Sequence, residues 1–176
     1  SLAKANRIAR VYTDYTQLLK EDNADFVYIA LVNSAHYDYV RQALEADRNV
    51  IVEKPFTTSL SQAEELASLA RSRNLYLFEA VSLLHTPNFK LVKDSLTRIA
   101  PIHLVQCNFS QYSSRFERYL QGDIAPAFNP KLGGGAMNDL NVYNINTVIG
   151  LFGEPLTTTY YANRGHNGID TSGTMV

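Results

Sequence analysis

Short apolar runs alternate, in the first half of the chain, with longer segments whose apolar residues recur at helical spacing. The strand-like runs are residues 25–31, 49–52 and 75–78. After the first of them, the apolar residues at helical spacing are Tyr37, Val40, Ala43 and Leu44. Strands that alternate with helices and are apolar on both faces build parallel sheets. The pattern therefore predicts an α/β fold whose parallel sheet is covered on both sides.

Small polar side chains stand where the expected helices begin. The candidate caps are Asp14, Ser34 and either Ser59 or Ser61. The side-chain oxygens of Asp and Ser accept hydrogen bonds from the free N–H groups of a first helical turn. We therefore expect helices to start directly after these residues.

The pattern changes near residue 98. Residues 102–112 form a longer and more amphipathic run, and residues 125–135, with two prolines and three glycines, are typical of a loop. Residues 136–152 predict a helix that ends at Gly153, and residues 157–163 are strand-like again. We place a domain boundary at about residues 98–101, which separates a domain at 1–98 from a domain at 99–176.

Composition and charge exclude some classes of function. The chain is 45% hydrophobic and 19% charged, with a net charge of −1, so it can bury a core. Nothing in this charge balance favours nucleic acid, which usually requires a clustered basic face. Its single cysteine, Cys107, allows no internal disulfide. No apolar run approaches the ~20 residues that span a bilayer, and residues 1–10 lack the apolar core of a signal peptide. We expect a cytoplasmic location without a membrane partner.

The two ends of the chain suggest that it is a fragment. Residues 1–9 look like the end of a helix without its beginning, and the chain stops soon after a strand-like segment starts. We therefore expect a βαβ unit that begins upstream of this sequence.

The segment Val50–Phe56, which reads VIVEKPF, ends an apolar strand on a charged pair and a proline. Ligands of an open parallel sheet bind outside the carboxyl ends of its strands, where this segment would place Glu53 and Lys54. Pro55 fixes its own φ and favours an extended Lys54, which would hold the ammonium in one direction. The alternative is a solvated charge pair at a strand end.

Polar residues follow the neighbouring strands as well. Asn33 would lie at the same edge after the first strand, where it either bonds a ligand or turns the chain into a helix. His36 falls in the first helical turn, a position typical of a surface histidine. Glu79 ends the third strand and either contacts a ligand or is solvated.

A glycine-rich loop, Gly133 to Gly135, leads into a helix with a polar line on an otherwise apolar surface. Asp139 and Tyr143 are four residues apart and would share a helix face, which Asn146 extends. The alternative is an acidic residue favoured by the helix dipole and a tyrosine that serves packing. The four histidines have no ligand spacing, so we predict no metal site.

In combination, these motifs resemble the Gfo/Idh/MocA family of NAD(P)-dependent oxidoreductases. That family has a strand followed by Thr-Pro-Asn-x-x-His, a strand followed by Glu-Lys-Pro, and a glycine-rich loop before Asp-x-Gly-x-(His/Tyr). The chain has ALVNSAH at 30–36, EKP at 53–55 and GGGAMNDLNVY at 133–143. The resemblance covers nearly the whole chain, and the tyrosine at 143 is similar to the glucose–fructose oxidoreductase and dimeric dihydrodiol dehydrogenase branch.

The resemblance implies a fold and a reaction. Residues 1–98 would be a partial Rossmann-type parallel sheet, and residues 99–176 the start of an α+β domain with a mostly antiparallel sheet. The reaction would be hydride transfer between NAD or NADP and a CH–OH group of a sugar, polyol or diol. The complete protein would be a homodimer or homotetramer.

The resemblance also implies roles for individual residues. Lys54 would lie at the nicotinamide and substrate, Asp139 would contact substrate, and Tyr143 would take the proton-transfer position. The residues lining the dinucleotide would be Asn33, His36, Glu53, Lys54 and Glu79.

The chain departs from the family pattern at several points. Val32 replaces a proline, which loosens that turn, and Asn141 replaces a glycine, which narrows the pocket or alters substrate choice. The G-x-G-x-x-G fingerprint is missing from the sequence. We therefore do not expect this chain alone to bind a dinucleotide tightly or to turn over.

The implied roles suggest a mechanism. A phenol has a pKa of ~10 in water, which is too high for an efficient base near neutral pH, and a nearby ammonium favours the phenolate. We therefore expect Lys54, stiffened by Pro55, to act on Tyr143 and on the substrate oxygen. Asp139 would either hold a substrate hydroxyl or orient Lys54.

Other classes of function stay open at this point. A catalytically silent Rossmann-like sensor would bind the cofactor without turnover. A flavodoxin-like binding module that carries the motifs by chance would leave Lys54 and Tyr143 far apart. A pure interaction fragment is a further alternative.

Overall fold

The computed structural model describes residues 2–21 and 23–176. The helices are α1 (Leu2–Ala5), α2 (Tyr15–Glu21), α3 (His36–Glu45), α4 (Leu60–Ser72), α5 (Pro87–Ser95), α6 (Phe116–Leu120) and α7 (Val142–Phe152). The strands are β1 (Phe26–Ile29), β2 (Asn49–Val52), β3 (Leu77–Glu79), β4 (Tyr160–Arg164) and β5 (Asp170–Met175). Short 3-10 turns lie at Asn33–Ala35, Ser82–His85, Leu96–Arg98, Pro126–Phe128 and Pro130–Leu132, and a π-helix spans Met137–Asn141.

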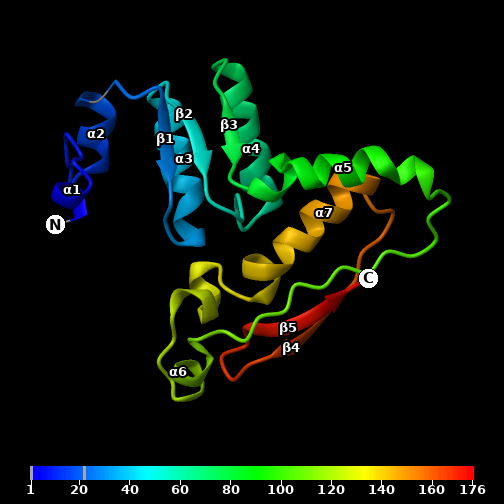
Figure 1. The fold of residues 1–176 in the computed structure, drawn as a ribbon. Coiled ribbons are helices and arrows are strands. Elements are labelled where there is room, and N and C mark those ends of the chain that lie inside the picture. Colours follow the sequence, from blue (N-terminus) through cyan, green and yellow to red (C-terminus); the bar gives the residue numbers. More distant parts are fainter. Residues whose placement is uncertain (1, 22) are drawn as a thin grey trace.

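The first part of the chain forms a parallel sheet with the order β1-β2-β3 (Figure 1). Val52 pairs with Ile29 on one side and with Glu79 on the other, so the carboxyl ends of the strands are level. The predicted α/β fold is confirmed, and β2 has the predicted bounds.

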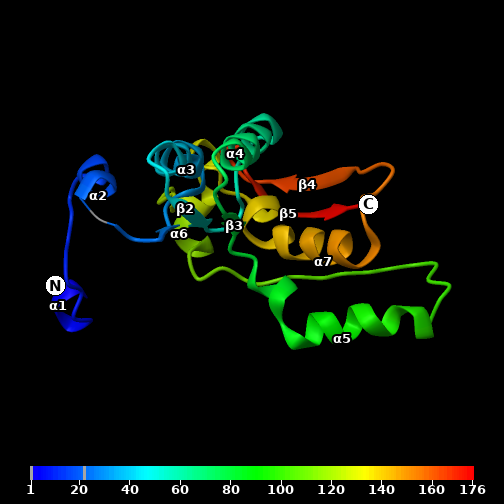
Figure 2. The same ribbon diagram turned by 90° about the horizontal axis from the view of Figure 1, so that it is seen from above.

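Helices α3 and α4 pack on the same side of this sheet (Figure 2). The core between these helices and the sheet contains buried aliphatic residues: Ile29, Val40, Ala43, Leu44, Val50, Val52, Leu66 and Ala70. The other face carries exposed aromatic rings, of which Phe78 stacks with both Phe26 and Tyr76. The prediction of a sheet covered on both sides is therefore wrong for the described residues, where helices cover one face.

Local hydrogen bonds test the predicted helix starts. Asp14 caps α2, since its side chain accepts a hydrogen bond of 2.9 Å from the N–H of Gln17. Ser59, one of the two predicted candidates, is the N-cap residue of α4, although its hydroxyl lies 2.9 Å from that of Ser61 and makes no capping hydrogen bond. The prediction for Ser34 is wrong, because it lies inside a 3-10 turn and α3 begins one residue after Ala35.

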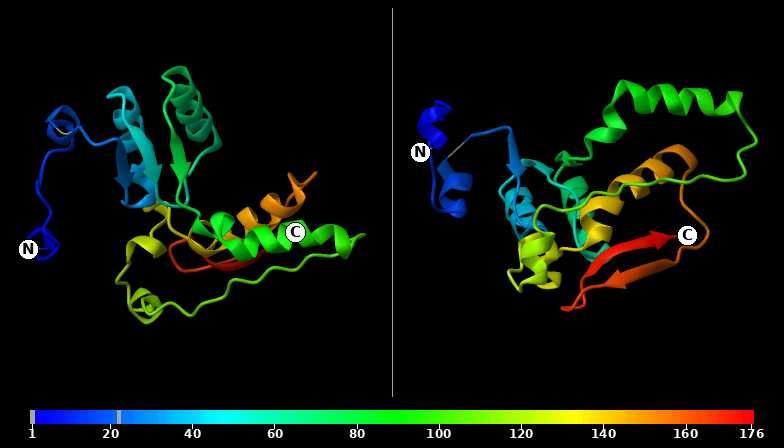
Figure 3. Two further views of the ribbon diagram at one scale, coloured as in Figure 1. Left: turned by 45° about the horizontal axis from the view of Figure 1, so that its top comes forward. Right: turned by 60° about the horizontal axis from the view of Figure 1, so that its bottom comes forward.

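The second part of the chain contains an antiparallel hairpin, β4-β5. Helix α7 lies between α5 and this hairpin (Figure 3). Residues 102–112 are assigned no regular secondary structure. A small core of Tyr119, Phe128 and Ile169 packs beneath the loop before the π-helix. The antiparallel sheet is confirmed, whereas the domain boundary at about 98–101 stays a prediction.

Helix α7 ends where the sequence predicted, at Gly153, whose φ of +86° suits glycine. Its beginning differs, because residues 137–141 form a π-helix instead of a first α-helical turn. Within the described residues, no helix has the length and apolar character that crossing a bilayer requires.

Candidate functional site

The site lies where the three parallel strands end. The N–H of Glu53 donates to the carbonyl of Ile29 at 2.9 Å, and the N–H of Ala80 donates to the carbonyl of Val52 at 2.8 Å. These bonds continue the sheet by one residue on each side and deliver Glu53 and Lys54 to its carboxyl edge. This edge is where open α/β sheets bind their ligands.

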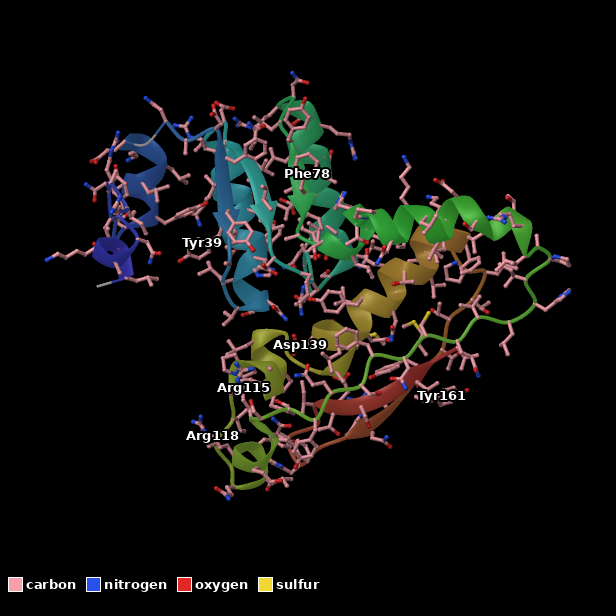
Figure 4. All side chains as sticks on the ribbon, viewed as in Figure 1. Tyr39, Phe78, Arg115, Arg118, Asp139 and Tyr161 are labelled. Carbon is pink, nitrogen blue, oxygen red and sulfur yellow. The ribbon has the colours of Figure 1, made fainter. Side chains whose placement is uncertain are left out.

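Lys54 contacts Asp139 through two of its three ammonium donors. The Lys54 Nζ donates to Asp139 Oδ1 at 2.9 Å and to the Asp139 backbone carbonyl at 2.6 Å. The Lys54 side chain is 15% exposed and the Asp139 side chain 47% exposed, so the lysine is the more buried partner. Asp139 lies between the parallel sheet and the hairpin (Figure 4). One ammonium donor remains for a ligand, because Lys carries three.

The ring of Tyr143 contacts the same ammonium. The Lys54 Nζ is 5.0 Å from the centroid of the Tyr143 ring, within the range of a cation–π interaction. Among the described residues, no hydrogen bond joins that ammonium to the Tyr143 hydroxyl. The structure thus brings Lys54, Asp139 and Tyr143 together, with the lysine against the ring face of the tyrosine.

The π-helix at Met137–Asn141 carries Asp139, and Tyr143 follows in the first turn of α7. The sequence predicted a regular α-helix in which these residues share a face. In a π-helix the chain is wound more loosely, a feature frequent at functional sites. Both residues nevertheless contact Lys54.

Asp170 holds the start of this helix and was not identified from the sequence. Its Oδ2 accepts hydrogen bonds from the N–H of Met137 at 2.6 Å and from the hydroxyl of Tyr160 at 2.8 Å. Burial, followed by the hydrogen bond and the charge of Asp170, raises the pKa of Tyr160 to about 12. Asp170 is separated from Met137 by 33 residues, so no local pattern indicates the contact.

Phe109 is a second residue that sequence reasoning missed. Its ring stacks on Tyr143 with centroids 5.1 Å apart and an interplanar angle of 19°. Phe109 comes from the extended run 102–112 and is 45% exposed. This stacking favours one orientation of the Tyr143 ring and places an apolar ring beside the site.

Asn33 joins the parallel sheet to the glycine-rich loop. Its amide donates to the carbonyl of Gly133 at 2.8 Å, and the amide of Asn138 donates to the same oxygen at 3.0 Å. Gly133 has a φ of +73°, and a Cβ there would lie 2.7 Å from Thr58 Cγ2. A side chain at this position would be strained by the positive φ and crowded by Thr58. The Asn33 amide nitrogen already has a partner within the protein.

His36 is buried, so the prediction of a surface histidine is wrong. Its Nδ1 lies 2.9 Å from the carbonyl of Pro55, and its Nε2 lies 3.1 Å from the carbonyl of Leu31. With both nitrogens against backbone oxygens, the ring has no free polar atom for a dinucleotide.

The two predicted carboxylates also contact the protein. Glu53 accepts hydrogen bonds from the Tyr28 hydroxyl and from the N–H of Lys54. Glu79 accepts a bond of 2.8 Å from the N–H of Phe56. Burial raises the pKa of Glu79, an effect opposed by this bond and by the charge of His36.

The donor set fits one end of a nicotinamide dinucleotide. Lys54 retains a donor and Glu53 is partly exposed at the strand ends, which suits hydroxyl and carboxamide groups. The chain has no G-x-G-x-x-G segment, so we assign no residue to the pyrophosphate. Within residues 2–21 and 23–176, no group of three or more His, Cys, Asp or Glu residues could hold a metal ion.

The chain is similar in sequence to known oxidoreductases. A family model described as an oxidoreductase family with an NAD-binding Rossmann fold matches residues 1–81. An uncharacterised oxidoreductase of Escherichia coli, YgjR, is 33% identical over 169 residues, which are 96% of this chain and 52% of that protein. The scyllo-inositol 2-dehydrogenase (NADP⁺) IolU of Bacillus subtilis is 30% identical over 99% of this chain and 53% of its own length.

A solved structure supports the same assignment. The crystal structure of an oxidoreductase from Bacteroides fragilis superposes with a TM-score of 0.72 at 26% identity, over 99% of this chain and 48% of that one. The chain thus spans about half the length of the curated relatives it matches. Motifs, fold and relatives agree, and the chain belongs to the Gfo/Idh/MocA family of oxidoreductases.

Proposed function

We propose that the protein is an oxidoreductase that transfers a hydride between NAD or NADP and a CH–OH group of a sugar, polyol or diol. The observation that carries this proposal is the contact of Lys54 with both Asp139 and Tyr143 at the carboxyl edge of the parallel sheet. Membership of an NAD-binding family and the similarity to an NADP-dependent inositol dehydrogenase support the cofactor and the substrate class.

Oxidation of a carbinol requires that its hydroxyl proton leave as the hydride leaves carbon. The nicotinamide, when bound, supplies the hydride chemistry. Lys54 holds the substrate oxygen with its remaining ammonium donor, and Tyr143, whose ring contacts both this charge and Phe109, exchanges the proton. An ammonium beside the substrate oxygen also stabilises the negative charge that develops there.

Asp139 orients Lys54 in this proposal. Of the two roles that the sequence leaves open, orientation is favoured because two Asp139 oxygens already accept hydrogen bonds from the ammonium. In the other role, the Asp139 carboxylate, whose side chain is 47% exposed, would bind a substrate hydroxyl. The two roles predict different kinetic effects, which are separated below.

The test is the variant Lys54→Met in the full-length protein. Loss of a participant in proton transfer lowers turnover by roughly 10²–10⁴-fold, so kcat for the NAD(P)-linked oxidation of a polyol should fall by that factor. Survival of turnover within ~10-fold would show that Lys54 has no such role. If the unaltered protein binds the dinucleotide but shows no turnover, it is instead a catalytically silent sensor.

We also propose a cytoplasmic homodimer or homotetramer. The single cysteine fits a reducing compartment, and the β4-β5 hairpin presents an exposed edge on which a larger sheet could be completed. Sedimentation of the full-length protein measures the oligomeric state.

A further inference from the structure

A single peptide unit after Lys54 is held from two sides. The carbonyl of Pro55 lies 2.9 Å from His36 Nδ1, and the next N–H, that of Phe56, donates to Glu79 Oε1 at 2.8 Å. In a trans peptide unit the C=O and the N–H point in opposite directions. The two side chains therefore fix both the place and the rotation of this one unit.

The side chains that hold it come from rigid elements. His36 is the first residue of α3, is fully buried and also contacts the carbonyl of Leu31, two residues after β1 ends. Glu79 is the last residue of β3 and pairs with Val52 in the sheet. The loop that carries Lys54 is thus tied to the carboxyl ends of both neighbouring strands.

Neither side chain is explained by packing alone. His36 is the one polar residue among the fully buried side chains of the described part of the chain, and Glu79 is half-buried. A buried polar group is unfavourable unless it is hydrogen-bonded, and an aliphatic residue would fill either place without that requirement. The hydrogen bonds to residues 55 and 56 are what these residues provide.

We propose that His36 and Glu79 are positioning residues that clamp the Pro55–Phe56 peptide unit and thereby aim the Lys54 ammonium at Asp139 and Tyr143. This inference rests on the proposed function, because the direction of Lys54 matters to catalysis only if Lys54 takes part in it. A misplacement of a reacting group by ~1 Å can lower a rate by about 10²-fold. Release of the clamp should therefore reduce kcat while the binding surface for the dinucleotide persists.

The first test compares Glu79→Leu with Glu79→Gln in the full-length protein. The glutamine retains the Oε1 that accepts from Phe56, whereas the leucine does not. Glu79→Leu should lose the hydrogen-exchange protection of the Phe56 amide and lower kcat by about 10–100-fold, with KM for the dinucleotide within about 3-fold. Glu79→Gln should keep both the protection and kcat within about 3-fold.

The second test compares His36→Asn with His36→Gln. The amide nitrogen of asparagine falls near the position of Nδ1 and can still donate to Pro55, whereas that of glutamine falls near Nε2 and can donate only to Leu31. His36→Asn should retain more turnover than His36→Gln, although both introduce a cavity. If Glu79→Leu shows no cooperative thermal unfolding transition and is therefore not folded, the two His36 variants test whether the clamp positions Lys54.

Lys54→Met and the unaltered protein together separate failure of this inference from failure of the proposed function. If Lys54→Met is inactive and Glu79→Leu frees the Phe56 amide yet keeps kcat within about 3-fold, the clamp does not position Lys54. Equal turnover of the two His36 variants has the same meaning. If Lys54→Met is fully active, Lys54 takes no part in the reaction and the clamp has no reacting group to position. If the unaltered protein oxidises no polyol, sugar or diol with NAD or NADP, the proposed function itself is wrong.

Discussion

The ammonium of Lys54 and the carboxylate of Asp139 lie 2.9 Å apart although 85 residues separate them in the chain. The first follows a strand of the parallel sheet, and the second lies in the π-helix that precedes α7. This ion pair joins the two parts of the chain at the point where the chemistry is proposed.

Asp139→Asn tests whether Asp139 orients Lys54 or binds substrate. Asparagine keeps an oxygen acceptor but removes the charge that holds the ammonium. If Asp139 orients Lys54, we expect kcat to fall about 10-fold or more with little change in the substrate KM. A rise in KM at constant kcat would assign Asp139 to substrate binding instead. Steady-state kinetics of the full-length protein with a polyol substrate distinguish the two.

Tyr143→Phe isolates the hydroxyl from the ring. Phenylalanine keeps the stacking with Phe109 and the cation–π contact with Lys54 but cannot exchange a proton. We expect turnover to fall by roughly 10²–10⁴-fold. The free energy of unfolding should change by less than about 1 kcal/mol, as measured by denaturant titration.

Phe109→Leu is the matched control for that variant. It removes the stacked ring and leaves the Tyr143 hydroxyl in place, so it should reduce turnover less than Tyr143→Phe. A larger loss for Phe109→Leu would show that ring orientation, and not the hydroxyl, limits the reaction.

Glu79→Gln should change how stability depends on pH. Burial raises the pKa of Glu79 in the folded protein above its ordinary value of 4.5. The folded state therefore binds the carboxyl proton more tightly than the unfolded state, and ionisation of Glu79 opposes folding. Relative to Glu79→Gln, the free energy of unfolding of the unaltered protein should fall as the pH rises from below 4.5 through the raised pKa. Denaturant titrations across this pH range measure the difference, and a constant difference would contradict the shift.

Gly133→Ala should weaken the junction between the sheet and the glycine-rich loop. Gly122 provides the control, because it also has a positive φ, +88°, but a Cβ there would meet nothing within 4 Å. Gly122→Ala should cost about 1–2 kcal/mol of stability from backbone strain alone. Gly133→Ala should cost about 1–3 kcal/mol more, because its Cβ meets Thr58 and Asn33. Equal losses of unfolding free energy in the two variants would show that Thr58 and Asn33 move to accommodate the added Cβ without a loss of stability.

Local pattern determined the elements of the first part of the chain and the chemistry that follows them. Periodicity places β2 at Asn49–Val52, and parallel strands necessarily bring their carboxyl ends to one edge, so Glu53, Lys54 and Glu79 could be located there in advance. Asp14 and Gly153 act within one helical turn of their own positions, and for that reason the sequence identified both.

Only the tertiary structure decided what these residues contact. His36 is buried because the loop after β2 folds over it, and the Asn33 amide is used by Gly133, 100 residues away. Asp170 and Phe109 reach the site from distant segments whose local patterns are ordinary. Helical and strand periodicity report the environment of a residue within its own element, whereas hydrogen-bond partners and ring contacts depend on how separate elements pack. The sequence therefore determined which groups reach the sheet edge, and packing determined which of them face a ligand and which hold the loop in place.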